Sequence, residues 1–135
     1  LAVTLVARAG FFWFTGGSGR LDPGTSVQWD WDMYRLSVQV RVKAIEPNAR
    51  ILMEWSSSGS PPTTVEWTFA RRADGTTFVS VTNSGFRGTQ EEILQQVIGS
   101  TQGFALVLAG LKAWLEHGVR LHLVADRHPD GLGQR

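Results

Sequence analysis

Apolar and polar residues alternate along much of the stretch 26–82. A repeat of two places successive side chains on opposite faces of a β-strand, so each apolar set predicts the inward face of one strand. The predicted inward rows are Val27, Trp29, Trp31 and Met33; Leu36, Val38, Val40 and Val42; Ile51, Met53 and Trp55; Val65, Trp67 and Phe69; and Val79 and Val81. Short turns at 46–48 and 73–75 favour an antiparallel meander of these five strands.

The repeat changes beyond residue 88. Apolar residues then recur every three or four positions, the spacing of one face of an α-helix: Ile93, Leu94, Val97, Ile98, Phe104, Val107, Leu108, Leu111 and Leu115. Thr89 and Glu92 have the spacing of a capping box, and Gly118 is a typical glycine at a helix C-terminus. Glycine costs about 1 kcal/mol relative to alanine inside a helix, so Gly99 and Gly103 predict a bend or break. The predicted fold class is α+β, a curved antiparallel sheet with one long C-terminal helix.

Composition limits the class of protein. A length of 135 residues fits a single domain over 1–135, and 42% hydrophobic with 19% charged residues is typical of a folded chain. The net charge is +1 and the basic residues are scattered, so no nucleic-acid partner is indicated. Cysteine is absent, which fits a cytoplasmic protein, and no apolar run approaches the ~20 residues of a membrane span. The unusual feature is a total of six tryptophans.

Two groups of residues suggest ligand or metal binding but have simpler explanations. The glycine-rich run 15–20 lacks the lysine of a phosphate-binding loop and no helical pattern follows it, so it predicts a flexible turn. His117, His122 and His128 have neither helical nor zinc-finger spacing. We expect them to be exposed, with His117 favoured electrostatically at a helix C-terminus.

Side chains suited to catalysis are also sparse. Asp30 and Asp32 alternate with tryptophans along one strand, and since the apolar pair is expected to face inward, the two carboxylates are expected to face solvent. Ser84 does not lie in a Gly-x-Ser-x-Gly elbow, and the chain has no cysteine nucleophile. We therefore expect no catalytic residue, no cofactor and no metal.

A further set of motifs occurs along the chain: Trp13-Phe14-Thr15, Gly24, Trp29-Asp30-Trp31, Ile45-Glu46-Pro47, Glu54-Trp55, Asn83-Ser84-Gly85-Phe86, and Leu-Ala-Gly-Leu-Lys-Ala-Trp-Leu-Glu at 108–116. From about residue 12 to residue 126 these motifs resemble the SRPBCC superfamily. Within it the chain is most similar to bacterial homologues of the activator of the heat-shock protein 90 ATPase. The resemblance implies a helix-grip, START-like fold, with a long helix lying across a curved sheet.

The chain departs from this family at its N-terminus. The family places a first strand and a short helical pair ahead of the Trp-Phe-Thr motif, and only residues 1–11 remain to supply them. Residues 1–9 are either that strand, with the helical pair shortened or missing, or the end of the helical pair. Alternation of Leu1, Val3, Leu5 and Ala7 favours the strand.

The tryptophans at inward positions suggest a ligand site as well as a core. Buried aromatic residues usually belong to the core. If the helix spans the sheet without filling it, some of this surface lines a pocket, and Asn83 continues the inward row of Val79 and Val81 with an amide. An apolar pocket with few polar groups is typical of small-ligand sites. The candidate ligand-binding residues are Trp29, Trp31, Met53, Trp55, Trp67, Asn83, Phe104 and Leu108.

Two classes of function follow. The first is binding of a small hydrophobic molecule between sheet and helix, and the superfamily resemblance adds polyketide cyclase-like catalysis as a variant of it. The second is a co-chaperone-like role through surface contact with a heat-shock chaperone. Apart from Asn83 and Tyr34, the inward rows offer no polar group for catalysis. Larger relatives with the co-chaperone role have two domains, so binding without catalysis is the favoured interpretation.

Overall fold

The structure is a computed structural model, and it describes residues 16–17, 22, 24–31, 36–57 and 59–127. The predicted position of residues 1–9 and the side chains of Trp29 and Trp31 lie outside this description. His128 and Asp32 also lie outside it.

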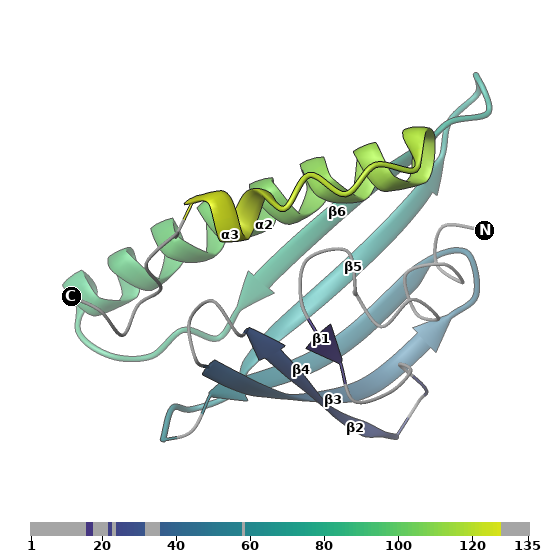
Figure 1. Cartoon of the computed structure of the whole chain (residues 1–135). Helices are drawn as coiled ribbons and strands as arrows, with labels where there is room; N and C mark the ends of the chain where they lie inside the picture. The colour runs from purple at the N-terminus through teal and green to yellow at the C-terminus, as the bar shows by residue number, and fades with distance from the viewer. Residues whose placement is uncertain (1–15, 18–21, 23, 32–35, 58, 128–135) are drawn as a thin grey trace.

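An antiparallel sheet is the main element of the fold (Figure 1). Its strands follow one another in space in the order of the sequence, as expected of a meander. They are β1 (Gly16–Gly17), β2 (Ser26–Trp31), β3 (Leu36–Glu46), β4 (Arg50–Ser57), β5 (Thr63–Arg71) and β6 (Thr77–Ser84). The five strands predicted from the alternating pattern are confirmed, and β1 is a short addition ahead of them.

The strand register aligns the predicted inward rows across the sheet. Trp67 lies opposite Ile51 on one side and Val81 on the other, and Met53 lies opposite Val65. Trp67 is only 1% exposed, and Ile51, Met53 and Val65 have no exposed surface. The apolar face of the sheet is therefore the core, as the period of two predicts.

A β-bulge in β3 explains an apparent irregularity in the apolar pattern. Val42 pairs with Met53 and Ala44 pairs with Leu52, so Lys43 is an extra residue without a counterpart in β4. One extra residue shifts the alternation by one position, which lets Ile45 join the inward face three residues after Val42. The predicted turn follows, where Asn48 adopts a left-handed conformation with φ of 62°.

The long helix α2 (Gln90–His117) covers part of the inward face (Figure 1). Its capping box is formed as predicted: Glu92 N–H donates to Thr89 Oγ1, and Thr89 N–H donates to Glu92 Oε2. The helix ends at Gly118, which adopts the left-handed conformation at φ of 66°. A short helix, α3 (Leu123–Arg127), which the pattern did not predict, packs Val124 into the core.

Of the bend or break expected near Gly99 and Gly103, the break is wrong, because α2 continues through both residues. Two glycines weaken a helix by only about 2 kcal/mol in total. Burial of Val107 and Leu111 against the sheet offsets a cost of this size. The packing of one apolar face therefore outweighs the low helix propensity of glycine, and the helix stays continuous.

The helix α2 is also long and apolar enough to cross a membrane by length and composition alone, with a mean hydropathy of 1.2 over its best 18-residue window. Core helices of soluble proteins pass the same test. Here α2 packs on the sheet through Val107 and Leu111, and Phe104 contacts aromatic residues of β4 and β5. These residues of α2 therefore have a structural role within the fold, whereas Leu94, Val97 and Ile98 are exposed.

Candidate functional site

An aromatic cluster joins α2 to the sheet. The ring of Phe104 stacks on Trp55 of β4, with centroids 5.4 Å apart and planes 19° from parallel. Its ring also meets Trp67 of β5 edge to face, with centroids 6.2 Å apart and planes at 79°. Both geometries are favourable for aromatic pairs. Phe104 therefore occupies the space that lies directly between α2 and these two tryptophans.

A cavity of about 440 Å³ lies on the other side of Phe104, between β6 and α2. Its volume falls within the usual 300–1,000 Å³ of small-ligand sites. The lining residues come from the end of β6, the segment after it and one side of α2: Val81, Thr82, Asn83, Phe86, Val97, Ser100, Thr101, Phe104, Ala105 and Leu108. Most of these side chains are apolar, so the cavity suits a molecule with an apolar body.

The cavity wraps around the edge of the sheet. Successive side chains of a strand point to opposite faces, yet Val81, Thr82 and Asn83 all line the same cavity. Within the described part of the sheet, β6 is the last strand in the order. The cavity therefore extends from the inward face to the edge of β6, with α2 as its opposite wall.

Asn83 and Ser100 are polar residues of the cavity wall, together with Thr82 and Thr101. The Asn83 amide nitrogen Nδ2 donates a hydrogen bond to Ser100 Oγ at 2.9 Å, linking β6 to α2. The amide oxygen Oδ1 is buried and has no hydrogen-bond partner. Asn83 occupies this position because it pairs with Val65 and so continues the inward face of β6.

The candidate residues from the sequence fall into three groups. Asn83, Phe104 and Leu108 line the cavity together. Met53 and Trp67 are buried in the core, and Trp55 is half-buried against Phe104. Trp29 and Trp31 belong to β2, but the orientation of their side chains is outside the described structure. Their role as ligand contacts stays a prediction.

Sequence reasoning missed most of the helical wall. Val97, Thr101, Phe104 and Leu108 are spaced at four, three and four residues, which places them on one side of α2. Thr101 broke the apolar pattern, although its hydroxyl donates to the Val97 carbonyl at 2.8 Å and leaves its methyl group to line the wall. The helical spacing of Thr101 from Val97 and Phe104 is the signal in the sequence that could have identified it as a wall residue.

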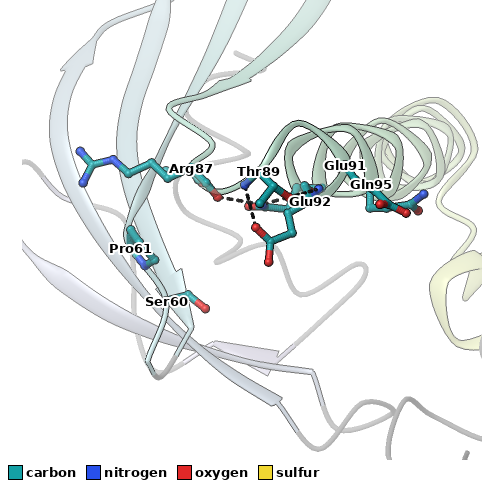
Figure 2. Close-up of a pocket in the computed structure, with 9 residues that line it drawn as sticks. Ser60, Pro61, Arg87, Thr89, Glu91, Glu92 and Gln95 are labelled. Carbon is teal, nitrogen blue, oxygen red and sulfur yellow. Dashed lines mark hydrogen bonds between the residues drawn. The ribbon is translucent and has the colours of Figure 1, made fainter.

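A second, larger hollow of about 710 Å³ lies at the start of α2 (Figure 2). It is lined mostly by polar and charged residues of the β4–β5 loop, the start of β5, the segment before α2 and the first turns of α2: Ser60, Pro61, Thr63, Arg87, Thr89, Glu91, Glu92, Gln95 and Gln96. Glu92 is already engaged in the capping box, and its hydrogen bond from the Thr89 backbone lowers its pKa. The hollow is larger than the β6–α2 cavity, but its lining does not suit an apolar molecule.

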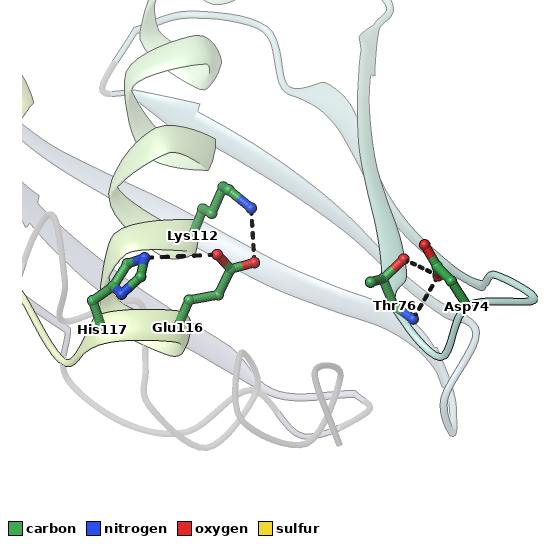
Figure 3. Close-up of polar contacts among 5 residues, drawn as sticks. All are labelled: Asp74, Thr76, Lys112, Glu116 and His117. Atoms are coloured by element: carbon green, nitrogen blue, oxygen red, sulfur yellow. Dashed lines mark hydrogen bonds and ion pairs between the residues drawn. The ribbon is translucent and has the colours of Figure 1, made fainter.

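Surface charges form local pairs. Near the end of α2, Lys112 Nζ lies 2.7 Å from Glu116 Oε1, and His117 Nε2 lies 3.9 Å from Glu116 Oε2 (Figure 3). The hydrogen bond from Lys112 lowers the pKa of Glu116. In the turn before β6, hydrogen bonds from Thr76 lower the pKa of Asp74. These exposed pairs stabilise local structure.

No group of three or more histidine, aspartate or glutamate side chains is placed to hold a metal among the described residues. His117 and His122 are exposed, as predicted. Gly16 and Gly17 of the glycine-rich run form β1. The other residues of that run lie outside the described structure. The side chain of Asp30 is likewise not described.

The sheet with one long C-terminal helix defines an α+β protein of the helix-grip class. Residues 7–116 match the family described as activator of Hsp90 ATPase homolog 1-like protein, and the chain belongs to this family. No curated protein matches the chain.

Two solved structures are similar. DynU16, a protein in the dynemicin biosynthetic locus, superposes with a TM-score of 0.71 at 26% identity over 88% of this chain. The chain spans only 43% of DynU16. The protein SSP2350 from Staphylococcus saprophyticus superposes with a TM-score of 0.67 at 24% identity, covering 89% of this chain and 84% of that protein, and supports the fold alone.

Proposed function

We propose that the protein binds a small hydrophobic molecule in the cavity between β6 and α2. The observation that carries this proposal is the cavity of about 440 Å³, whose wall is mostly apolar and contains the amide of Asn83. An apolar wall supplies affinity through burial, and a small number of polar groups supply orientation.

The family and its structural relatives fit this proposal. DynU16 is described as a protein of a biosynthetic locus, which suits a fold that handles small molecules. Since the chain spans less than half of DynU16, neither a ligand nor an activity is carried over from it. The described part of the cavity wall presents no carboxylate, histidine or lysine for acid–base chemistry, so binding without catalysis is the proposed role.

Ligand binding should be visible in tryptophan fluorescence. Trp55 stacks on Phe104, and Phe104 lines the cavity, so a ligand against Phe104 changes the surroundings of an indole. The test titrates the protein with 2-naphthol, a flavonoid and a medium-chain fatty acid, and calorimetry checks each signal. We expect saturable binding of at least one compound.

Two variants locate the site. Phe104→Ser should weaken binding about tenfold, which corresponds to roughly 50 Å² of lost apolar contact at ~25 cal/mol per Å². Val97→Ser should also weaken binding, and because Val97 is 39% exposed the fold should be kept. Phe78→Ser, on β6 but outside the cavity lining, is the control and should bind as the unmodified protein does. Absence of binding to the whole panel would reject the proposal and favour the surface-binding interpretation.

A further inference from the structure

In the proposed site, only one of the two hydrogen-bonding atoms of the Asn83 side-chain amide has a partner. Asn83 has one amide group, and its nitrogen is held by Ser100 at 2.9 Å. Its oxygen Oδ1 is buried without a partner. A buried carbonyl oxygen without a hydrogen bond is unfavourable, and most such groups in folded proteins have a partner. The unpartnered oxygen on a cavity wall therefore points to a ligand group that would complete it.

We propose that Asn83 selects apolar ligands that carry a hydroxyl or N–H group, which donates a hydrogen bond to Asn83 Oδ1. The inference rests on the proposed function and specifies the chemistry of its ligand. An amide oxygen accepts hydrogen bonds and cannot donate one, so ethers and ketones do not satisfy it. Phenols, alcohols and N–H-bearing amides attached to an apolar body can donate the hydrogen bond that this oxygen accepts.

The link to Ser100 determines how the oxygen is presented. The hydroxyl of Ser100 accepts from Nδ2 and so occupies the nitrogen side of the amide. Asn83 is part-buried as a residue, while Oδ1 itself is shielded. The terminal torsion of asparagine is soft, so a modest rotation exposes the oxygen to the cavity while the amide stays close to Ser100. Ligand binding is thus coupled to the contact between β6 and α2.

The rest of the wall supports this selectivity. Thr101, the other hydroxyl on the described helical wall, already donates to the Val97 carbonyl at 2.8 Å. Val81, Phe104 and Leu108 offer only apolar surface. A ligand with its polar group beside Val81, Phe104 or Leu108 would bury that group against apolar side chains, which is unfavourable. The ligand therefore places its hydroxyl or N–H group beside Asn83 and its apolar body along α2.

The test compares 2-naphthol with 2-methoxynaphthalene, which share a ring system but differ in the hydroxyl hydrogen. We expect the unmodified protein to bind 2-naphthol about tenfold more tightly, the effect of one hydrogen bond. In Asn83→Leu the affinity for 2-naphthol should fall to that for 2-methoxynaphthalene, which should be retained. Thr77→Val is the matched control, because Thr77 lies on β6 outside the cavity lining, and its preference should equal that of the unmodified protein. Calorimetry measures the affinities of both compounds for all three proteins.

Each result separates this inference from the proposed function. Equal affinities of the two compounds in the unmodified protein, or an unchanged preference in Asn83→Leu, would overturn the role of Asn83 while leaving the apolar site in place. Binding of neither compound would overturn this inference, and it would overturn the proposed function as well if the flavonoid and the fatty acid also fail to bind. If Asn83→Leu does not fold, Ser100→Ala decides, because loss of the anchoring hydroxyl should reduce the preference at least threefold. An unchanged preference in Ser100→Ala would contradict the proposal.

Discussion

At the scale of the residue, Trp67 is the centre of the packing between the sheet and α2. It is 1% exposed, it is flanked by Ile51 and Val81 on neighbouring strands, and its ring meets Phe104 from α2. No single element buries it alone. Its burial therefore depends on the correct register of β4, β5 and β6 together with the position of α2.

Trp67→Ala should lower the free energy of unfolding by about 3–5 kcal/mol, because truncation of a fully buried aromatic leaves a cavity that the surroundings fill only in part. Chemical denaturation followed by circular dichroism measures the change. Phe78→Ala is a suitable control: Phe78 is 52% exposed and its ring lies under the Arg72 guanidinium, so its loss should cost less than about 1 kcal/mol. A loss within about half a kcal/mol for Trp67→Ala would contradict the observed register.

Single residues also mark the limit of sequence reasoning about the site. The alternation along β6 placed Asn83 on the inward face, which the pairing with Val65 confirms. The pattern gave no sign that its nitrogen would bond Ser100, seventeen residues further along, since that contact requires the relative position of two elements. Burial of a residue follows from periodicity, but its polar partner follows only from the assembled fold.

At the scale of the element, α2 holds two glycines that serve no packing need. A Cβ added at Gly99 or Gly103 would meet no atom within 4 Å, and both residues lie inside a continuous helix. Gly99→Ala should therefore raise the free energy of unfolding by about 0.5–1 kcal/mol, because alanine loses less backbone entropy on folding. Gly118→Ala provides the opposite case: at φ of 66° alanine is strained and should destabilise. Thermal unfolding compares the two, and equal effects would contradict this account.

The start of α2 should give the protein a pH-dependent stability. The Thr89 backbone N–H donates to the Glu92 carboxylate, which lowers the pKa of Glu92 from its ordinary value of 4.5. A carboxyl group with a lower pKa in the folded state binds its proton more readily in the unfolded state. Its contribution is therefore present above pH 4.5 and is lost as the pH falls through the lowered pKa of the folded protein.

Glu92→Gln tests this prediction because glutamine keeps the capping geometry without a titrating group. The variant should lose less stability than the unmodified protein when the pH falls from about 5 to 3, as measured by melting temperature. Asp74 and Glu116 also have lowered pKa values and remain in both proteins, so the difference between the proteins isolates Glu92. Identical pH profiles would show that the hydrogen bond from Thr89 does not favour the ionised form.

The elements themselves were largely predictable. The period-two alternation of apolar and polar residues predicted the strands and their inward faces, since each strand has one apolar face. The capping signals fixed both ends of α2, from Thr89 to Gly118. The bulge at Lys43 and the continuity of α2 were missed, because both depend on packing against a neighbouring element. Local rules determine where elements begin and end, and tertiary contacts decide their irregularities.

At the scale of the whole molecule, the position of the cavity differs from the simplest expectation. A ligand beneath the helix was expected to touch the tryptophans of the sheet directly. The ring of Phe104 occupies the space above Trp55 and Trp67, and the described cavity lies beside it, towards β6. Side-chain size and rotamer determine this arrangement, and neither is encoded in the alternation of apolar and polar residues.

The location of the ligand can be tested across the whole fold with hydrogen exchange. A ligand at 100 times its dissociation constant stabilises the folded state by about 2.7 kcal/mol, so 2-naphthol should raise the melting temperature. If it binds beside Phe104, amides of β6 and α2 should gain the most protection, since these elements form the cavity wall. Strands β2 and β3 should change less, because none of their described residues lines the cavity. Protection concentrated in β2 and β3 would instead place the ligand beside Trp29 and Trp31, and would move the proposed site to that end of the sheet.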